Sequence, residues 1–131
     1  MGTTIRPFLM FEGKAEAAMS FYVSLFAESE ILDIVRYGPG EAGAEGSIMK
    51  ATFTVGGQTV MCTDSVMKHD FTFTPAFSLF VECESEEDIR RLSSALADGG
   101  TMFMPLGEYG FSRLFTWLSD RYGVSWQLNL P

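Results

Sequence analysis

The sequence GFSRLFTWLSDRYGVSWQLNL, at residues 110–130, predicts two β-strands joined by a turn. Residues 112–118 are rich in aromatic and β-branched side chains, and residues 119–123 contain turn formers. Residues 124–130 alternate strictly, and successive side chains of a strand point to opposite faces. One face is apolar (Val124, Trp126, Leu128, Leu130) and the other is polar (Ser125, Gln127, Asn129). We therefore expect a helix to cover the apolar face and the polar face to line a hydrated concavity.

The composition is that of a folded, water-exposed domain. The chain has 131 residues, of which 47% are hydrophobic, and this suffices for a core. No apolar run approaches the roughly 20 residues that a membrane helix needs. The N-terminal residues MGTTIRP do not show the basic-then-apolar layout of a signal peptide. A cytoplasmic location without membrane contact is therefore predicted.

The charge balance argues against nucleic acid as a partner. Nine Lys and Arg stand against seventeen Asp and Glu, which gives a formal charge of −8. Nucleic-acid binding relies on basic residues that displace counterions, and no basic cluster is found here. The two cysteines, Cys62 and Cys83, lack C-x-x-C spacing, so we interpret them as small buried apolar residues.

The order of expected elements repeats. A strand, a helix and three strands occur twice, separated by a linker-like stretch at residues 64–72. The first half has strands at 4–11, 30–37, 47–55 and 58–63 and a helix at 14–27; the second has strands at 75–83, 101–106, 112–118 and 124–130 and a helix at 85–98. The expected fold is α+β, a single domain of two paired βαβββ modules, at about 4–64 and 73–131. The modules would form a curved mixed sheet around a central cavity, with the helices outside.

The alternation also assigns the faces of the other strands. We expect the helix side to carry Phe8, Met10, Val60, Cys62, Phe77, Leu79, Val81, Trp126 and Leu128. The cavity side would carry Pro7, Leu9, Phe11, Thr59, Met61, Thr63, Ala76, Ser78, Phe80, Ser125, Gln127 and Asn129. The second set is smaller and more polar, as a cavity lining requires.

The repeat, together with DRYGVSWQL at residues 120–128, resembles the vicinal oxygen chelate superfamily. That superfamily includes glyoxalase I, extradiol dioxygenases, and bleomycin- and fosfomycin-resistance proteins. More closely, PFLMFEGKAEAAMSFY at residues 7–22, RYGPGE at 36–41, and GFSR with WLSDRYGVSWQ at 110–127 are similar to the PhnB-like branch, labelled 3-demethylubiquinone-9 3-methyltransferase-like. The resemblance implies a homodimer and, in catalytic members, lyase, isomerase or dioxygenase activity.

The resemblance also implies where a metal would bind, because the superfamily takes one ligand from the first and last strand of each half. Those positions are Pro7, Met61, Ala76 and Gln127 here, and only Gln127 could be a ligand. A divalent transition metal needs several N, S or carboxylate ligands. We therefore expect no cofactor, with a divalent metal as the disfavoured alternative. The methyltransferase label has no support either, because no Gly-rich first turn of a doubly wound sheet is present.

Several residues are candidates for ligand binding. Gln127 and Asn129 would either orient a ligand or form an internal hydrogen-bond network. Lys50 would either hold an anion in the cavity or reach solvent. His69 is the only histidine, and we expect either a surface residue or a proton shuttle that caps the cavity. An aromatic wall with one arginine could clamp a flat or acidic molecule, and Met61 would face the same cavity; the wall comprises Tyr109, Phe111, Arg113, Phe115 and Trp117.

Two functions follow from these expectations. The first is a glyoxalase-like protein that binds a small oxygen-rich or aromatic metabolite in the cavity between the modules, with or without catalysis. The alternative is a non-catalytic sequestering protein of the bleomycin-resistance type, for which the charge of −8 favours a cationic compound. A purely structural or regulatory dimer is a third, weaker reading. The substrate and the dimer arrangement, module-swapped or side by side, stay open.

Overall fold

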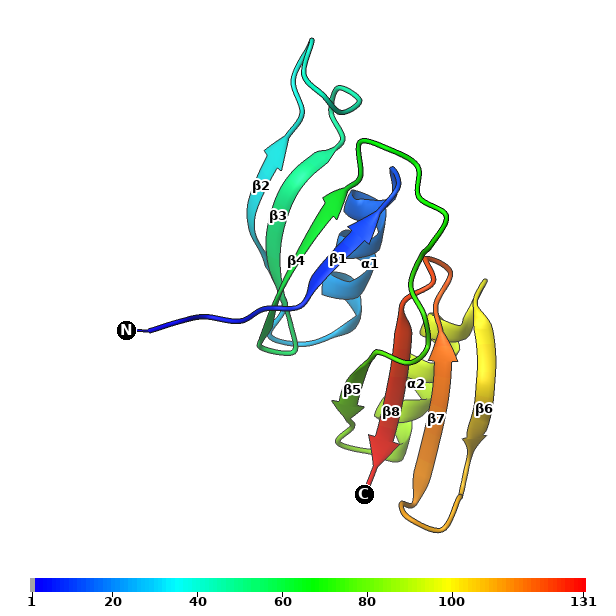
Figure 1. The fold of residues 1–131 in the computed structure, drawn as a ribbon. Helices are drawn as coiled ribbons and strands as arrows, with labels where there is room; N and C mark the ends of the chain where they lie inside the picture. Colours follow the sequence, from blue (N-terminus) through cyan, green and yellow to red (C-terminus); the bar gives the residue numbers. More distant parts are fainter. Residues whose placement is uncertain (1) are drawn as a thin grey trace. The chain divides into compact units, whose positions relative to one another are not determined.

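A computed structural model describes residues 2–131 of the chain. These residues form two helices and eight strands, divided between two compact units, Met1–His69 and Asp70–Pro131 (Figure 1). Each unit has the order strand, helix, three strands, and each holds its own four-stranded mixed sheet. The predicted α+β fold of two βαβββ modules is therefore confirmed. A cavity shared by the modules stays a prediction.

The first unit folds one helix onto a sheet with the strand order β1-β4-β3-β2. Strands β1 and β4 are parallel, and the other neighbours are antiparallel. The elements are β1 (Phe8–Phe11), α1 (Ala15–Leu25), β2 (Ile31–Arg36), β3 (Ile48–Val55) and β4 (Gln58–Asp64). The core lies between α1 and one face of the sheet, where Met19 and Tyr22 of the helix and Phe53, Val60 and Cys62 of the sheet are almost fully buried.

The face assignment of β1 was wrong by one residue. Leu9 is 5% exposed, whereas Phe8 is 58% exposed. The cause is the register, since Leu9 pairs with Cys62, and paired residues share a face. Cys62 is fully buried on the α1 side, so Leu9 and Phe11 face the helix, and Phe8 and Met10 lie on the opposite face. The strand is also shorter than the predicted range of 4–11, since it begins at Phe8 and does not include residues 4–7.

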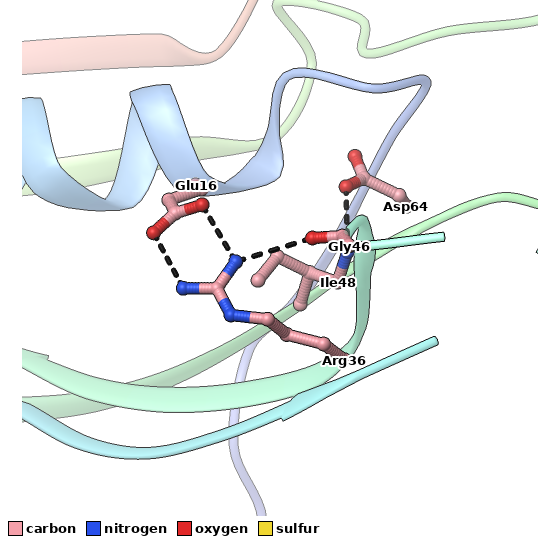
Figure 2. A network of polar contacts seen from close by, with 5 residues as sticks. All are labelled: Glu16, Arg36, Gly46, Ile48 and Asp64. Carbon is pink, nitrogen blue, oxygen red and sulfur yellow. Dashed lines mark hydrogen bonds and ion pairs between the residues drawn. The ribbon is translucent and has the colours of Figure 1, made fainter. Parts of the chain in front are cut away.

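A buried carboxylate closes one end of the first sheet. Asp64 is at the end of β4, and its Oδ1 accepts hydrogen bonds from the backbone N–H groups of Gly13 and Ala15 at 2.9 and 3.0 Å. Its Oδ2 accepts the backbone N–H of Ile48 at 3.0 Å (Figure 2). One side chain therefore joins Gly13 and the first residue of α1 to the first residue of β3, and it pairs the N–H groups of the buried Ala15 and Ile48, which would otherwise be unsatisfied.

An ion pair on the same unit ties α1 to β2. Both terminal nitrogens of Arg36 donate to the Glu16 carboxylate at 2.7 Å, and Nη1 also donates to the Gly46 carbonyl at 3.1 Å (Figure 2). Arg36 shares its sheet face with its partner Ile48, which explains why it reaches the helix. Because Gly46 lies near the end of the loop between β2 and β3, Arg36 links that part of the loop to α1.

The second unit repeats this arrangement with the strand order β5-β8-β7-β6. Strands β5 and β8 are parallel, and the other neighbours are antiparallel. The elements are β5 (Ser78–Glu82), α2 (Glu86–Ala97), β6 (Thr101–Gly107), β7 (Leu114–Ser119) and β8 (Ser125–Leu130). Ser85 caps α2, because its hydroxyl accepts a hydrogen bond from the backbone N–H of Asp88 at 3.1 Å. Three acidic residues in the first turn stabilise the helix by their interaction with its dipole.

The core of the second unit matches the alternation of residues 124–130. Trp126 and Leu128 are buried against Ile89, Leu92 and Leu96 of α2, the stripe expected from the helix. Each large buried side chain contributes roughly 1.5–3 kcal/mol. Leu79 and Val81 lie on the same face by register, but Phe77 precedes β5 and is 66% exposed, so its assignment to the helix side was wrong.

Candidate functional site

The face of the second sheet opposite α2 brings the predicted polar residues together. Phe80 of β5 pairs with Gln127 of β8, and Gln127 pairs with Trp117 of β7. Paired side chains of neighbouring strands stand on one face. We call this surface the open face; its residues on the three strands are Ser78, Phe80, Glu82, Phe115, Trp117, Ser119, Ser125, Gln127 and Asn129.

Four aromatic rings form a continuous cluster at one end of the open face. Phe115 contacts Phe111 edge to face at 5.0 Å between ring centroids, Tyr109 at 6.2 Å and Phe80 at 6.5 Å. Tyr109 and Phe111 stack on each other at 6.3 Å. Phe115 is buried at the centre, while Phe80 and Phe111 are 56% and 61% exposed. The cluster therefore presents ring surface that the second unit itself does not cover.

Trp117 extends the aromatic surface along β7. Its ring lies 5.1 Å from that of Phe103 on β6, and it is half-buried. Its indole N–H donates to the Ser125 hydroxyl at 3.0 Å, which fixes the direction of the ring. Trp117 and Phe111, two of the predicted ligand-binding residues, thus belong to one surface with Gln127.

Gln127 is held by a chain of hydroxyl groups. Its Nε2 donates to the Ser78 hydroxyl at 3.3 Å, and that hydroxyl lies 2.7 Å from the hydroxyl of Ser125. Asn129 makes a separate bond, in which Nδ2 donates to Glu82 Oε1 at 2.7 Å. Both amides are therefore hydrogen-bonded within the second unit, while Gln127 stays half-buried on the open face. A role of either amide in orienting a ligand stays a prediction.

The other predicted site residues lie elsewhere. Arg113 precedes β7 and is exposed, and its Nε donates to the Pro131 carbonyl at 2.8 Å. Lys50 and Met61 belong to the first unit. Both lie on the face opposite α1, since Lys50 pairs with Val35 and Met61 with Phe8 and Thr52.

His69 makes local contacts at the end of the first unit. Its Nε2 is 2.9 Å from the Ser65 hydroxyl, and its backbone N–H donates to Glu12 Oε2 at 3.4 Å. The Ser65 hydroxyl also donates to the carbonyl of Met67 at 2.7 Å. The residue therefore helps to order residues 65–69.

The residues present do not fit a divalent transition metal. Among residues 2–131, no group of three or more His, Cys, Asp and Glu side chains lies close enough to hold one. Burial raises the pKa of the Cys62 thiol to about 12 and that of the Cys83 thiol to about 11. The expectation that no cofactor is bound stays a prediction.

Sequence reasoning missed three residues of this surface as site residues. Phe80 joins the ring cluster, and Ser78 and Ser125 hold Gln127 and Trp117. Their alternation placed Ser78, Phe80 and Ser125 on the correct side, but the pairing of β5 with β8 is what brings them next to Gln127.

Each of the two units has the βαβββ order of elements, with a parallel strand pair at one edge of its sheet. The same fold occurs in the fosfomycin resistance protein FosX of Listeria monocytogenes, which is 13% identical to this chain, with a TM-score of 0.61 over 98% of this chain and 92% of that one. At this identity the likeness concerns the fold alone. No helix in the part of the chain that the structure describes is long and apolar enough to span a membrane.

The chain belongs to the family described as 3-demethylubiquinone-9 3-methyltransferase, whose sequence model matches residues 3–129. A structure described as a putative 3-demethylubiquinone-9 3-methyltransferase, PhnB protein, from Bacillus cereus is 56% identical, with a TM-score of 0.96 over 98% of this chain and all of that one. Protein YjdN of Escherichia coli K12 is 22% identical over 140 residues, covering 96% of this chain and 94% of its own. The predicted PhnB-like membership is thus confirmed. The βαβββ order differs from the doubly wound sheet typical of methyltransferases, so the family description is not carried over as an activity.

Proposed function

We propose that this chain is a small-molecule-binding protein whose ligand carries an aromatic ring and lies on the open face of the second sheet. The observation that carries the proposal is the ring cluster of Phe80, Tyr109, Phe111 and Phe115, two of whose rings are more than half exposed. Stacked or edge-to-face ring pairs contribute about 0.5–1.5 kcal/mol beyond the burial of their area. A flat ligand would gain this energy against rings that are already in place.

The polar groups of the open face would orient such a ligand. Ligand sites combine apolar walls with a few polar groups, and here Gln127 lies between Phe80 and Trp117 in the pairing register. The formal charge of −8 raises the local concentration of cations around the chain. Arg113 is exposed near the end of the face, where its Nε already bonds to Pro131. We therefore propose a neutral or cationic aromatic compound, held stoichiometrically.

The catalytic alternative lacks a comparable observation. Lyase, isomerase or dioxygenase chemistry of the superfamily type would need ligands that the described residues do not group together. Elemental analysis and a thermal-shift screen with Mn²⁺, Fe²⁺, Ni²⁺ and Zn²⁺ test this alternative. A bound metal at one equivalent, with a rise in the melting temperature, would replace the binding function with a metal-dependent one.

Calorimetry with matched ring compounds tests the binding function. Tryptamine and indole-3-propionate carry the same ring with opposite charges, and we expect tryptamine to bind more tightly at low salt. Phe111→Ala should weaken its binding about fivefold, because it removes an exposed ring of the cluster. Phe77→Ala is the matched control, since Phe77 is 66% exposed in the same unit but outside the cluster. Equal losses in both variants, or no binding by either compound, would overturn the proposal.

A homodimer is the assembly that we propose. Strand β1 lies at the edge of its sheet and pairs there with β4 alone. It carries Phe8, which is 58% exposed, and Ile5, three residues earlier, is 89% exposed. Natural proteins seldom leave an apolar edge strand uncovered. Sedimentation equilibrium should give twice the mass of one chain, and Phe8→Ser should lower that mass toward one chain. A single-chain mass for the unmodified protein would contradict this assembly.

A further inference from the structure

A chain of hydrogen bonds runs across three strands of the open face, from Trp117 to Gln127. The Trp117 indole N–H donates to Ser125 at 3.0 Å, the hydroxyls of Ser125 and Ser78 lie 2.7 Å apart, and Gln127 Nε2 donates to Ser78 at 3.3 Å. Ser125 is buried, whereas the other three side chains are half-buried at the surface of the face. Ser125 therefore lies beneath the surface of the face, whereas Ser78, the Trp117 ring and the Gln127 amide all reach it.

The donor and acceptor roles along this chain are restricted. An indole N–H can only donate, so the Ser125 hydroxyl must accept from Trp117. The amide nitrogen of Gln127 is likewise a donor only, so Ser78 accepts from it and can itself donate to Ser125. With its nitrogen engaged, Gln127 keeps one strong acceptor, the carbonyl oxygen Oε1. No donor within residues 2–131 bonds to that oxygen.

We propose that Ser78 and Ser125 are positioning residues that hold Gln127 with Oε1 toward the ligand, so that the site selects aromatic compounds whose ring itself carries an N–H or O–H group. The inference rests on the proposed function and specifies its ligand class. A ring compound that covers Gln127 without such a donor leaves the carbonyl oxygen buried and unpaired, which is costly. A ring compound with a donor pairs that oxygen and also contacts the neighbouring rings.

The first experiment compares tryptamine with its ring N-methyl derivative by calorimetry. The two share ring and charge, and differ in one N–H. We expect the unmodified protein to bind tryptamine about tenfold more tightly, because a preference of this size lies within the free-energy cost of leaving a buried acceptor unpaired. Gln127→Met keeps the length of the side chain and removes the acceptor. The ratio of the two affinities should then fall to about one, because no acceptor is left to be buried unpaired. A preference that persists in Gln127→Met would reflect the size of the methyl group and overturn the inference.

The serines are tested by the same ratio. Ser78→Ala should reduce the preference to about twofold or less, because Gln127 can then turn either end of its amide to the ligand. Ser78→Thr restores the hydroxyl and should restore the preference. Ser119→Ala is the control, as Ser119 pairs with Ser125 on the open face and takes no part in the hydrogen-bond chain. An unchanged ratio in Ser78→Ala would show that Ser78 does not position Gln127.

Nuclear magnetic resonance tests the positioning without any ligand. The two indole N–H signals belong to Trp117, bonded to Ser125, and Trp126, bonded to Asp120. Ser125→Ala should shift the Trp117 signal and speed its exchange with water, and leave that of Trp126 unchanged. Ser78→Ala should bring the two amide protons of Gln127 toward equal exchange rates. If these spectral changes occur but neither tryptamine nor its ring N-methyl derivative binds, the proposed function is wrong, whereas the positioning of Gln127 by the serines is correct. If the spectral changes do not occur, the positioning itself is wrong.

Discussion

Asp120 accepts a 2.8 Å hydrogen bond from the indole N–H of Trp126, and both side chains are buried in the second unit. The other carboxylate oxygen of Asp120 accepts the backbone N–H groups of Tyr122 and Val124 at 2.8 and 3.1 Å. One acid thus organises the turn between β7 and β8 and fixes the largest side chain of the core. The motif DRYGVSW is therefore a folding element of this unit.

Asp120→Ala should strongly destabilise the protein. The substitution leaves three donors without their acceptor. Two of them, the Val124 N–H and the Trp126 indole N–H, are buried, and each buried unsatisfied group costs about 1–3 kcal/mol. We expect a loss of about 2–4 kcal/mol in the free energy of unfolding, measured by guanidinium titration with far-ultraviolet circular dichroism. Asp98→Ala is the control, because Asp98 is an exposed acid whose bond to Arg121 is 3.4 Å long. If Asp120→Ala cost less than about 1 kcal/mol, which is what an exposed ion pair contributes, this account would be contradicted.

The ion pair of Glu16 and Arg36 predicts a dependence of stability on pH. Hydrogen bonds from Arg36, helped by its charge, hold the pKa of Glu16 below its ordinary value of 4.5. A carboxylate with a lowered pKa stabilises the fold above the ordinary value, and this is lost as the pH falls through the lowered value. Glu16→Gln should therefore lower the urea midpoint at pH 7 and leave it unchanged at pH 2. Glu30→Gln, which replaces an exposed acid of the same unit, should leave the urea midpoint unchanged at both pH values. If Glu16→Gln lowered the midpoint more at pH 2 than at pH 7, the ion pair would not be the source of the stability.

Both thiols should be unreactive in the folded chain. Burial, and next the charge of Asp64, raises the pKa of Cys62 to about 12. Burial, and next the charge of Asp88, raises the pKa of Cys83 to about 11. Since thiolates are the reactive species, Ellman's reagent at pH 8 should modify neither cysteine until denaturant is added. Cys83→Ser identifies the reacting thiol; modification of either group in the native chain within seconds would show an opening that the fold does not account for.

Gly100 is a position where a side chain cannot fit. A Cβ atom there would lie 2.1 Å from the carbonyl oxygen of Ser119, a backbone atom that cannot move aside cheaply. Gly100→Ala should therefore cost about 1–3 kcal/mol or more, as overpacking does. Gly107→Ala, at the other end of β6, would bring a Cβ no nearer than 3.8 Å to Pro105 and should be almost neutral. Equal melting temperatures for the two variants would refute the steric argument.

The fold was predictable where the pattern was unambiguous. Residues 124–130 alternate without exception, and the resulting strand buries Trp126 and Leu128 as expected. The four residues of β1 are all apolar, so their alternation carries no information about the two faces. Their faces are decided by pairing with β4, where Leu9 meets Cys62. The start of β5 was placed too early because Phe77 N–H bonds back to Thr74 in a turn.

The candidate site was predictable only in part. Gln127, Trp117 and Phe111 were chosen from one short hairpin, and they do share one surface. Ser78 and Phe80 lie more than forty positions before Gln127, and their link to it depends on the parallel register of β5 and β8. Lys50 and Met61 lie in the first unit, and their role in a site stays a prediction.

Both tryptophans of the chain lie in the second unit, and the first unit contains none. Intrinsic emission on heating or in denaturant therefore records the melting of one half of the molecule, whereas circular dichroism averages over both. Superimposable curves from the two probes would mean that the halves unfold as one cooperative block. Displaced curves would mean that the two units unfold in separate transitions.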